Sequence, residues 1–243
     1  MQHLLRKMGN EQSTVKNVDK RTARREQAQY FVPAIRAFKM EHTDGKPVDV
    51  VTTKLDGEAA EQAAWGGMRV CVRKRPIFPH ELSQGEYDVV TCTLKGGGAA
   101  QVVVHDARLH SDMVHMFINH HAFTFDAVFG EAASNHHVYL ETAAPLVGRA
   151  VNDGVTATIM MYGQTGSGKT FTMSAIYESA SLDLFEAIAA APGPAPTVSV
   201  SFVELAGDKC ADMLNRGKQV QLLTGRDGAV HPYPLVCFAC VCS

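Results

Sequence analysis

The chain has 243 residues with 23 Lys and Arg against 25 Asp and Glu, which gives a formal net charge of −2. Apolar residues make up 46% and charged residues 20%, values typical of a globular protein that buries a core, and they exclude collagen-like, disulfide-scaffold and wholly disordered chains. The charge is uneven, because residues 1–40 hold nine basic and three acidic residues, a net of +6, and the rest is acidic.

The first 67 residues are predicted to form a basic arm with a helix, followed by a linker. Phe31, Ile35 and Phe38 are spaced four and three residues apart, which indicates one face of a helix beginning around Pro33. Residues 41–67 are polar and resemble a linker. We therefore divide the chain into an arm over residues 1–67 and a domain over residues 68–243.

Residues 68–129 are predicted to be rich in strands. Residues 68–73 alternate and end before Pro76. Residues 88–93 and 101–105 indicate a hairpin, because a run of three glycines separates them. Residues 123–129 alternate strictly and predict one further strand.

The next elements alternate between helix and strand. Residues 138–151 have helical periodicity, with a break predicted at Pro145. Residues 155–162 form an apolar run typical of a buried parallel strand. A helix over residues 182–191 and a strand over residues 198–205 follow. This order predicts an α/β domain with a central, mostly parallel sheet flanked by helices.

A glycine-rich loop follows the predicted buried strand and opens a helix. It reads Gly163-Gln164-Thr165-Gly166-Ser167-Gly168-Lys169-Thr170, which fits the pattern G-x-x-x-x-G-K-[ST] without a mismatch. Glycines allow backbone N–H groups to surround phosphate oxygens, a lysine at this place contacts the β- and γ-phosphates, and the threonine hydroxyl is a ligand of Mg²⁺. The loop predicts binding of a nucleoside triphosphate, with Lys169 on phosphate and Thr170 on the metal ion.

Two groups of possible metal ligands are less informative. Cys237, Cys240 and Cys242 form a C-x-x-C-x-C cluster with only His231 near, so we favour an apolar tail over a zinc site. The histidines at positions 105, 110, 115 and 120 recur every five residues. This spacing alternates the faces of a strand, so we predict that they do not converge as metal ligands. We see no secretory leader or membrane-spanning run and expect an intracellular chain with reduced thiols.

Four motifs in order resemble the kinesin motor domain, over roughly residues 68–215. They are Arg73-Lys74-Arg75-Pro76, the stretch from Phe123 through Val138-Tyr139, the loop Tyr162 to Met173, and Phe202-Val203-Glu204-Leu205 with Asp212-Met213-Leu214-Asn215. The resemblance implies a kinesin-type P-loop fold and a motor ATPase with ATP and Mg²⁺ as cofactors and microtubules as partner. It also implies that Arg73 and Pro76 lie on one side of the adenine and Phe171 on the other. A guanidinium, a proline ring and an aromatic ring can all stack on a base.

Within this family the chain resembles the internal-motor, microtubule-depolymerising class, kinesin-13. Residues 71–76 read C-V-R-K-R-P, and residues 31–39 resemble the end of that class's neck. The resemblance implies that the basic arm, through Lys20, Arg21, Arg24 and Arg25, meets acidic tubulin. The class carries a Lys-Val-Asp tip on a long hairpin; here the tip reads His110-Ser111-Asp112, with Arg108 just before it and only the acid retained.

Two further motifs of the family, N-x-x-S-S-R-S-H and D-L-A-G, do not occur in these residues, and we reject Glu204-Leu205-Ala206-Gly207 as the second because it lies in a predicted strand. We therefore expect a motor domain that is incomplete at its C-terminal side, without identifiable catalytic residues. The alternatives are a catalytically inactive tubulin-binding module and an unrelated P-loop NTPase.

The expected location is the cytoplasm, on microtubules such as those of the spindle. A membrane is not expected as a partner, because no uncharged apolar run is long enough to span a bilayer. Nucleic acid is not expected either, because the basic arm lacks interleaved aromatic residues.

Overall fold

The computed structural model describes residues 19–43, 50–52, 67–95, 98–110, 112, 115–190, 197–226, 228–236 and 238–240. These residues form two compact units, and each is taken by itself. The first holds the described residues up to Thr142 together with Met160–Ile176, and the second holds Ala143–Ile159 with Tyr177 and the described residues after it. None of the helices in the described ranges is long and apolar enough to cross a membrane. The proposed division at residue 67 stays a prediction.

Helix α1 (Lys20–Glu26) is followed at once by α2 (Ala28–His42). The Asp19 carboxylate caps α1 by accepting hydrogen bonds from the backbone N–H groups of Arg21 at 2.8 Å and Thr22 at 3.1 Å. Phe31 and Ile35 are buried, as their spacing predicted. The predicted start at Pro33 is wrong: the proline lies inside α2, where the buried face maintains the helix although one backbone hydrogen bond is missing.

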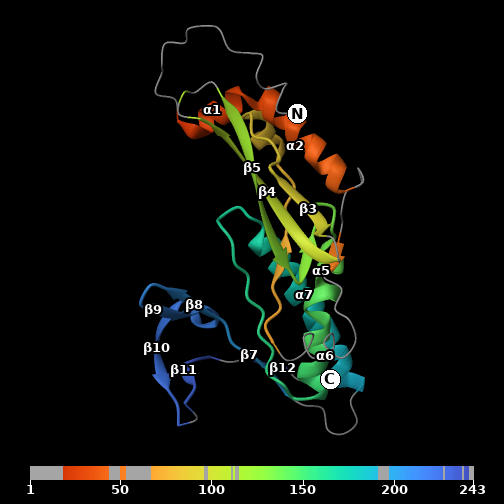
Figure 1. Ribbon diagram of the computed structural model, residues 1–243. Helices are drawn as coiled ribbons and strands as arrows, with labels where there is room; N and C mark the ends of the chain where they lie inside the picture. The colour runs from red at the N-terminus through yellow and green to blue at the C-terminus, as the bar shows by residue number, and fades with distance from the viewer. Residues whose placement is uncertain are drawn as a thin grey trace. The chain divides into compact units, whose positions relative to one another are not determined.

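A long antiparallel sheet is the main structure of the first unit (Figure 1). It consists of β3 (Val90–Lys95), β4 (Ala99–Leu109) and β5 (Met116–Phe125), in that order. This confirms the predicted hairpin. The register pairs His105 with His120, so these two histidines lie opposite each other, while the described residues contain no group of three or more His, Cys, Asp or Glu side chains that could hold a metal ion. Residues equally far from a hairpin turn lie opposite each other on one face of the sheet.

A small three-stranded sheet has β6 (Ala127–Phe129) at its centre, antiparallel to β1 (Val50–Thr52) and parallel to β2 (Cys71–Arg73). All three residues of β6 are buried. The single strand predicted over residues 123–129 is divided because Asp126 bonds to Val70: its carboxylate accepts from the Val70 N–H at 2.7 Å, and its own N–H donates to the Val70 carbonyl at 3.1 Å. Phe125 and Ala127 therefore belong to different sheets.

The remaining helices are α4 (Pro79–Ser83), α5 (Asn135–Thr142), α6 (Ala144–Asn152) and α7 (Lys169–Ala190). The break predicted at Pro145 is confirmed, because α5 ends at Thr142 and α6 begins two residues later with this proline in its first turn. The helix predicted over residues 182–191 is the C-terminal part of α7.

The strand predicted over residues 155–162 does not form. A buried parallel strand needs hydrogen-bonding partners along its edges, and none of the described strands pairs with this segment. Met160 and Tyr162 are 82% and 98% exposed, respectively, so the apolar run is not enclosed. Among the described strands, parallel pairing is confined to β2 with β6.

The second unit contains two antiparallel groups of strands. In the larger, β8 (Val203–Ala206), β9 (Lys209–Asp212), β10 (Lys218–Thr224) and β11 (Val230–Tyr233) pair in sequence, with the 3₁₀ turn η1 (Met213–Asn215) after β9. In the smaller, β7 (Val198–Val200) pairs with β12 (Phe238–Cys240). The strand predicted over residues 198–205 is thus two strands in two sheets. Cys237 and Cys242 lie outside the described residues, so the prediction for the cysteine cluster remains a prediction.

We expect Phe129→Ala to destabilise the first unit by about 3–5 kcal/mol, because it removes a buried ring from the central strand of the small sheet. Urea denaturation measures the change in the free energy of unfolding. The matched control is Phe123→Ala, which truncates a ring that is 51% exposed and should cost less than about 1 kcal/mol. Equal losses of unfolding free energy in the two variants would contradict the conclusion that β6 belongs to the core of the first unit.

Candidate functional site

The glycine-rich loop joins the exposed segment before it to the first turn of α7, which begins at Lys169. Gly166 and Gly168 have φ angles of 80° and 93°, in the left-handed region that favours glycine. The Ser167 N–H donates to the Gln164 carbonyl at 3.1 Å and closes the turn. The loop therefore presents its backbone at the start of a helix, where unpaired N–H groups attract anions.

The loop residues fit a phosphate group. A Cβ atom at Gly163 would lie 2.6 Å from the Ser167 Oγ, so the absence of a side chain at Gly163 lets the Ser167 hydroxyl approach the backbone of the loop. The Lys169 Nζ donates to the carbonyls of Gly163 at 2.7 Å and Gln164 at 2.9 Å, which holds the ammonium group over the loop. No acidic residue lies in the first turn of α7. The structure therefore holds the ammonium group of Lys169, from the first turn of α7, against the loop that precedes this helix.

Arg73, at the end of β2, contacts the first turn of α7. Its guanidinium donates to the Thr172 Oγ1 at 2.9 Å, to the Ala133 carbonyl at 2.8 Å and to the Asn135 side chain, and it lies 5.4 Å from the centre of the Phe171 ring. Burial lowers the pKa of Arg73. The structure thus brings Arg73 and Phe171 together beside the loop.

Several residues of this site are not found by sequence reasoning. Asn135 and Ala133 hold Arg73 from 62 and 60 positions away in the chain, and no local pattern marks them. Thr172 lies within the recognised loop motif, but its hydrogen bond to Arg73 is visible only in the structure. Thr170 is exposed at the start of α7 and Pro76 is exposed after β2; their predicted roles on Mg²⁺ and on the base stay predictions.

Lys74 connects the end of β2 to the N-terminal helices. Its Nζ donates to the Asp88 Oδ2 at 2.6 Å and pairs with Glu131 at 3.3 Å, while Lys39 of α2 bonds to the same Asp88 oxygen. Burial alone would lower the pKa of Lys74, but the bonds to Asp88 and Glu131 raise it. One carboxylate therefore joins α2 to the strand that ends beside the loop.

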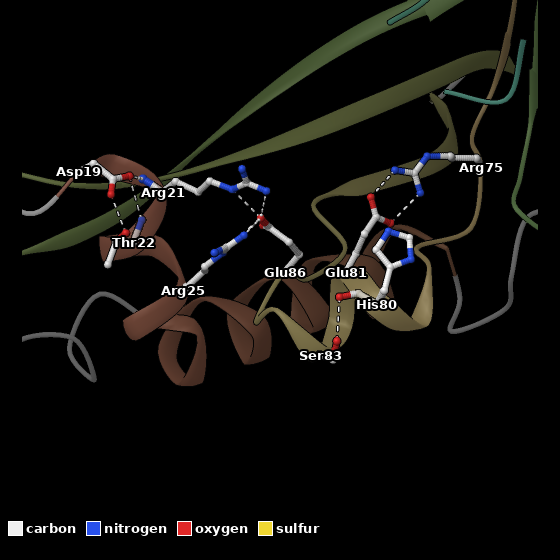
Figure 2. A network of polar contacts seen from close by, with 9 residues as sticks. All are labelled: Asp19, Arg21, Thr22, Arg25, Arg75, His80, Glu81, Ser83 and Glu86. Carbon is white, nitrogen blue, oxygen red and sulfur yellow. Dashed lines mark hydrogen bonds and ion pairs between the residues drawn. The ribbon is translucent and has the colours of Figure 1, made fainter. Parts of the chain in front are cut away.

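Arg75 fixes α4 next to the same strand (Figure 2). Both of its terminal nitrogens bond to the Glu81 carboxylate, which also accepts from the Phe78 N–H at 2.8 Å. The Arg75 guanidinium lies 4.5 Å from the centre of the Phe78 ring. The hydrogen bonds from Arg75, with that from Phe78, lower the pKa of Glu81 to about 2.

The predicted partner-binding residues of α1 fall into two pairs. Arg21 and Arg25 both bond to the Glu86 Oε1 within the chain, as Figure 2 shows, and the hydrogen bonds lower the pKa of Glu86. Lys20 and Arg24 are exposed. The first pair therefore holds α1 in place, and the second pair is the more accessible to an external partner.

The other predicted partner-binding residues lie at the end of the β4–β5 hairpin. Arg108 donates to Asp106 beside it on β4. The Asp112 carboxylate accepts from the His115 backbone N–H at 3.0 Å and from its imidazole. The His110 N–H donates to the His115 carbonyl at 2.8 Å and closes the turn. Asp112 is thus held at the tip of a long hairpin; Ser111 lies outside the described residues.

Comparisons with known proteins agree on the family. The model of the kinesin motor domain matches residues 73–231. Kinesin-like protein KIF24 is 39% identical over 160 residues in Mus musculus (63% of this chain, 11% of that protein) and 33% identical over 216 residues in Homo sapiens (84% and 15%). Diatom spindle kinesin-1 of Cylindrotheca fusiformis is 34% identical over 162 residues (67% and 25%). The chain spans a quarter or less of the length of these relatives.

Two solved structures have a similar fold. A fast kinesin has a TM-score of 0.58 at 22% identity, covering 71% of this chain and 48% of that one. KIF14, solved as a two-heads-bound dimer with AMP-PNP on a microtubule, has a TM-score of 0.56 at 26% identity, covering 71% and 50%. These similarities confirm the predicted α/β fold of the kinesin type.

The Arg75–Glu81 pair gives a pH-dependent prediction. Because the native pKa of Glu81 is about 2 rather than the ordinary 4.5, the pair stabilises the fold above pH 4.5, and this contribution is lost as the pH falls through about 2. We expect Arg75→Gln to raise the pKa of Glu81 toward 4.5 in an NMR titration of the carboxyl carbons. The exposed Arg226, replaced by Gln, is the control and should leave this pKa unchanged.

Proposed function

Because this chain belongs to the kinesin motor domain family, we propose that it is a microtubule-interacting ATPase that couples ATP hydrolysis to movement along microtubules or to their depolymerisation. The observation that carries the proposal is the grouping at the start of α7: the glycine loop, Lys169 above it, and Arg73 against Phe171 beside it. The KIF14 structure with AMP-PNP on a microtubule supports both proposed partners.

In this proposal the loop binds the triphosphate of ATP. Backbone N–H groups of Gly163–Thr170 surround the phosphate oxygens in this proposal, as in other glycine-rich phosphate-binding loops. Lys169 exchanges its bonds to the loop carbonyls for bonds to phosphate. The Thr170 hydroxyl would hold Mg²⁺, which, when bound, neutralises part of the phosphate charge.

The base would lie near Arg73, Pro76 and Phe171. A guanidinium and an aromatic ring both offer flat surfaces on which adenine stacks. The hydrogen bonds from Arg73 to Thr172 and Asn135 hold the guanidinium in place before any ligand enters. This fixed position lowers the entropic cost of binding.

Tubulin would meet the exposed cations of α1, Lys20 and Arg24, with Arg21 and Arg25 contributing as well as holding Glu86. The hairpin tip, with Arg108 and Asp112, would be a second contact, as in the depolymerising class that the sequence resembles. If this chain binds tubulin in this way, it would be located on cytoskeletal microtubules. The name of its relative, diatom spindle kinesin-1, supports a location on the spindle.

The alternative is a tubulin-binding module that does not hydrolyse ATP, in which the exposed cations of α1 carry the function. Microtubule-stimulated release of phosphate by the 243-residue chain separates the two proposals. Release that rises with microtubule concentration supports the motor. Binding to microtubules without any release supports the module.

We expect Lys169→Ala to weaken the binding of a fluorescent ATP analogue at least tenfold, because charge-assisted hydrogen bonds to phosphate contribute about 1.5–3 kcal/mol. Fluorescence titration measures the dissociation constant. Lys209→Ala removes an exposed lysine of β9 and is the matched control, with unchanged affinity. Equal affinity of the Lys169 variant and the parent chain would count against the proposed loop.

We expect the double variant Lys20→Glu with Arg24→Glu to bind microtubules about threefold or more weakly at low salt, because it reverses two exposed charges that face an acidic partner. Cosedimentation measures the affinity, and the difference should shrink as salt shortens the range of the attraction. Reversing the exposed Lys209 and Lys218 of the second unit is the control. A salt-independent difference would contradict an electrostatic role.

A further inference from the structure

Two histidines of the long hairpin lie directly under the C-terminal end of α2. His105 of β4 is 1% exposed, and its Nδ1 lies 2.7 Å from the Nδ1 of His120 on β5. Its Nε2 lies 2.7 Å from the Thr91 hydroxyl on β3. Both ring nitrogens of this buried imidazole are therefore occupied by partners within the sheet.

Phe38 of α2 packs on this pair. Its ring is stacked between His42, at a centroid distance of 3.8 Å, and His120, at 4.3 Å, and the His105 ring meets it edge-on at 4.8 Å. His42 donates from its Nδ1 to the Phe38 carbonyl at 2.9 Å. The Thr93 hydroxyl of β3 donates to the His42 carbonyl at 2.6 Å. The end of α2 is thus docked on the hairpin through three imidazoles and one aromatic ring.

The two facing nitrogens limit how many protons the pair can hold. A single hydrogen fits between them, donated by one Nδ1 to the lone pair of the other. One added proton can be taken at the outer nitrogen that still has a lone pair, Nε2 of whichever histidine donates from its Nδ1, with this bond kept. A second added proton would leave two N–H groups facing each other at the 2.7 Å separation of His105 and His120, so the fully charged pair cannot keep this geometry.

The groups around His105 and His120 make protonation of the pair less favourable. Lys39 and His42 of α2 and His121 of β5 are further basic groups near the pair, while Asp88, before β3, is a nearby acid and is already bonded to Lys39 and Lys74. Burial, with the nearby His120, lowers the pKa of His105 to about 4, and burial also lowers that of His120. The docked state therefore binds protons less readily than a hydrated imidazole would.

We propose that His105 and His120 form a pH-sensitive latch that docks the C-terminal end of α2 on the β4–β5 hairpin while at least one of them is neutral and releases it when both are charged. Undocking exposes His105 to water and restores its ordinary pKa of 6.5, so protons favour the released state. Docking is complete above pH 6.5 and weakens as the pH falls from 6.5 toward 4. The C-terminal end of α2 would then move away from the hairpin in mild acid.

Hydrogen exchange of the full chain at pH 7.5 and 5.5, corrected for the intrinsic pH dependence of exchange, tests the latch. We expect protection of the amides in residues 36–43 to fall about tenfold, because a pKa that rises from about 4 to 6.5 on release weakens docking about tenfold at pH 5.5. Helix α5, in the same unit, should change less than twofold. An equal change in α5 and in residues 36–43 would overturn the latch.

Two variants give the test its specificity. His105→Gln keeps hydrogen-bonding groups toward Thr91 and His120 but cannot gain charge, so the pH effect on residues 36–43 should drop below twofold. His137→Gln replaces an exposed histidine of α5 and should keep the tenfold effect. Retention of the tenfold effect in His105→Gln would refute the proposal.

A direct titration decides the question even if His105→Gln does not fold. In the parent chain, the imidazole resonances of His105 followed by NMR should titrate well below the ordinary 6.5, while protection of residues 36–43 already begins to fall near pH 6.5. Titration of His105 at 6.5 or above in the docked state would show that the pair accepts charge in place, and the latch would be rejected.

Discussion

The enclosure of β6 is the constraint on which the first unit depends. Its three residues are buried, with β1 along one edge and β2 along the other, so neither neighbour can change register without exposing apolar surface. The parallel register places Arg73 opposite Phe129 at the end of β2. From this place Arg73 bonds to Asn135 and Thr172, so a strand three residues long positions a cation beside the glycine-rich loop.

The three basic residues after Val72 bond in three different directions. Arg73 contacts the first turn of α7, Lys74 contacts Asp88, and Arg75 contacts Glu81 of α4. Through Asp88 the same short segment also reaches Lys39 of α2. The glycine loop and the N-terminal helices are thus connected to adjacent residues of one strand end, and a shift of that strand end would be felt at both places.

Local pattern predicts part of this architecture, and long-range pairing decides the rest. The glycine loop, the hairpin around the glycine run and the break at Pro145 follow from residues within a few positions of each other. The apolar run 155–162 has the composition of a buried strand but no partner among the described strands. The partners of Arg73 lie 60 to 99 positions away, and the pairing of His105 with His120 depends on the turn between them. Neither the contacts of Arg73 nor the pairing of these two histidines can be predicted from the spacing of residues within one element.

The hydrogen bonds of Lys169 to its own loop affect the free energy with which the loop binds an anion. Because the ammonium already holds the carbonyls of Gly163 and Gln164, an anion entering the loop competes with the backbone for the same cation. The two bonds are exchanged rather than created, so the net gain on binding is smaller than the strength of the new contacts. The same exchange runs in reverse when the anion leaves, since the carbonyls recapture the lysine. A loop whose carbonyls accept hydrogen bonds from its own lysine can therefore release a ligand without leaving the ammonium group short of hydrogen-bond partners.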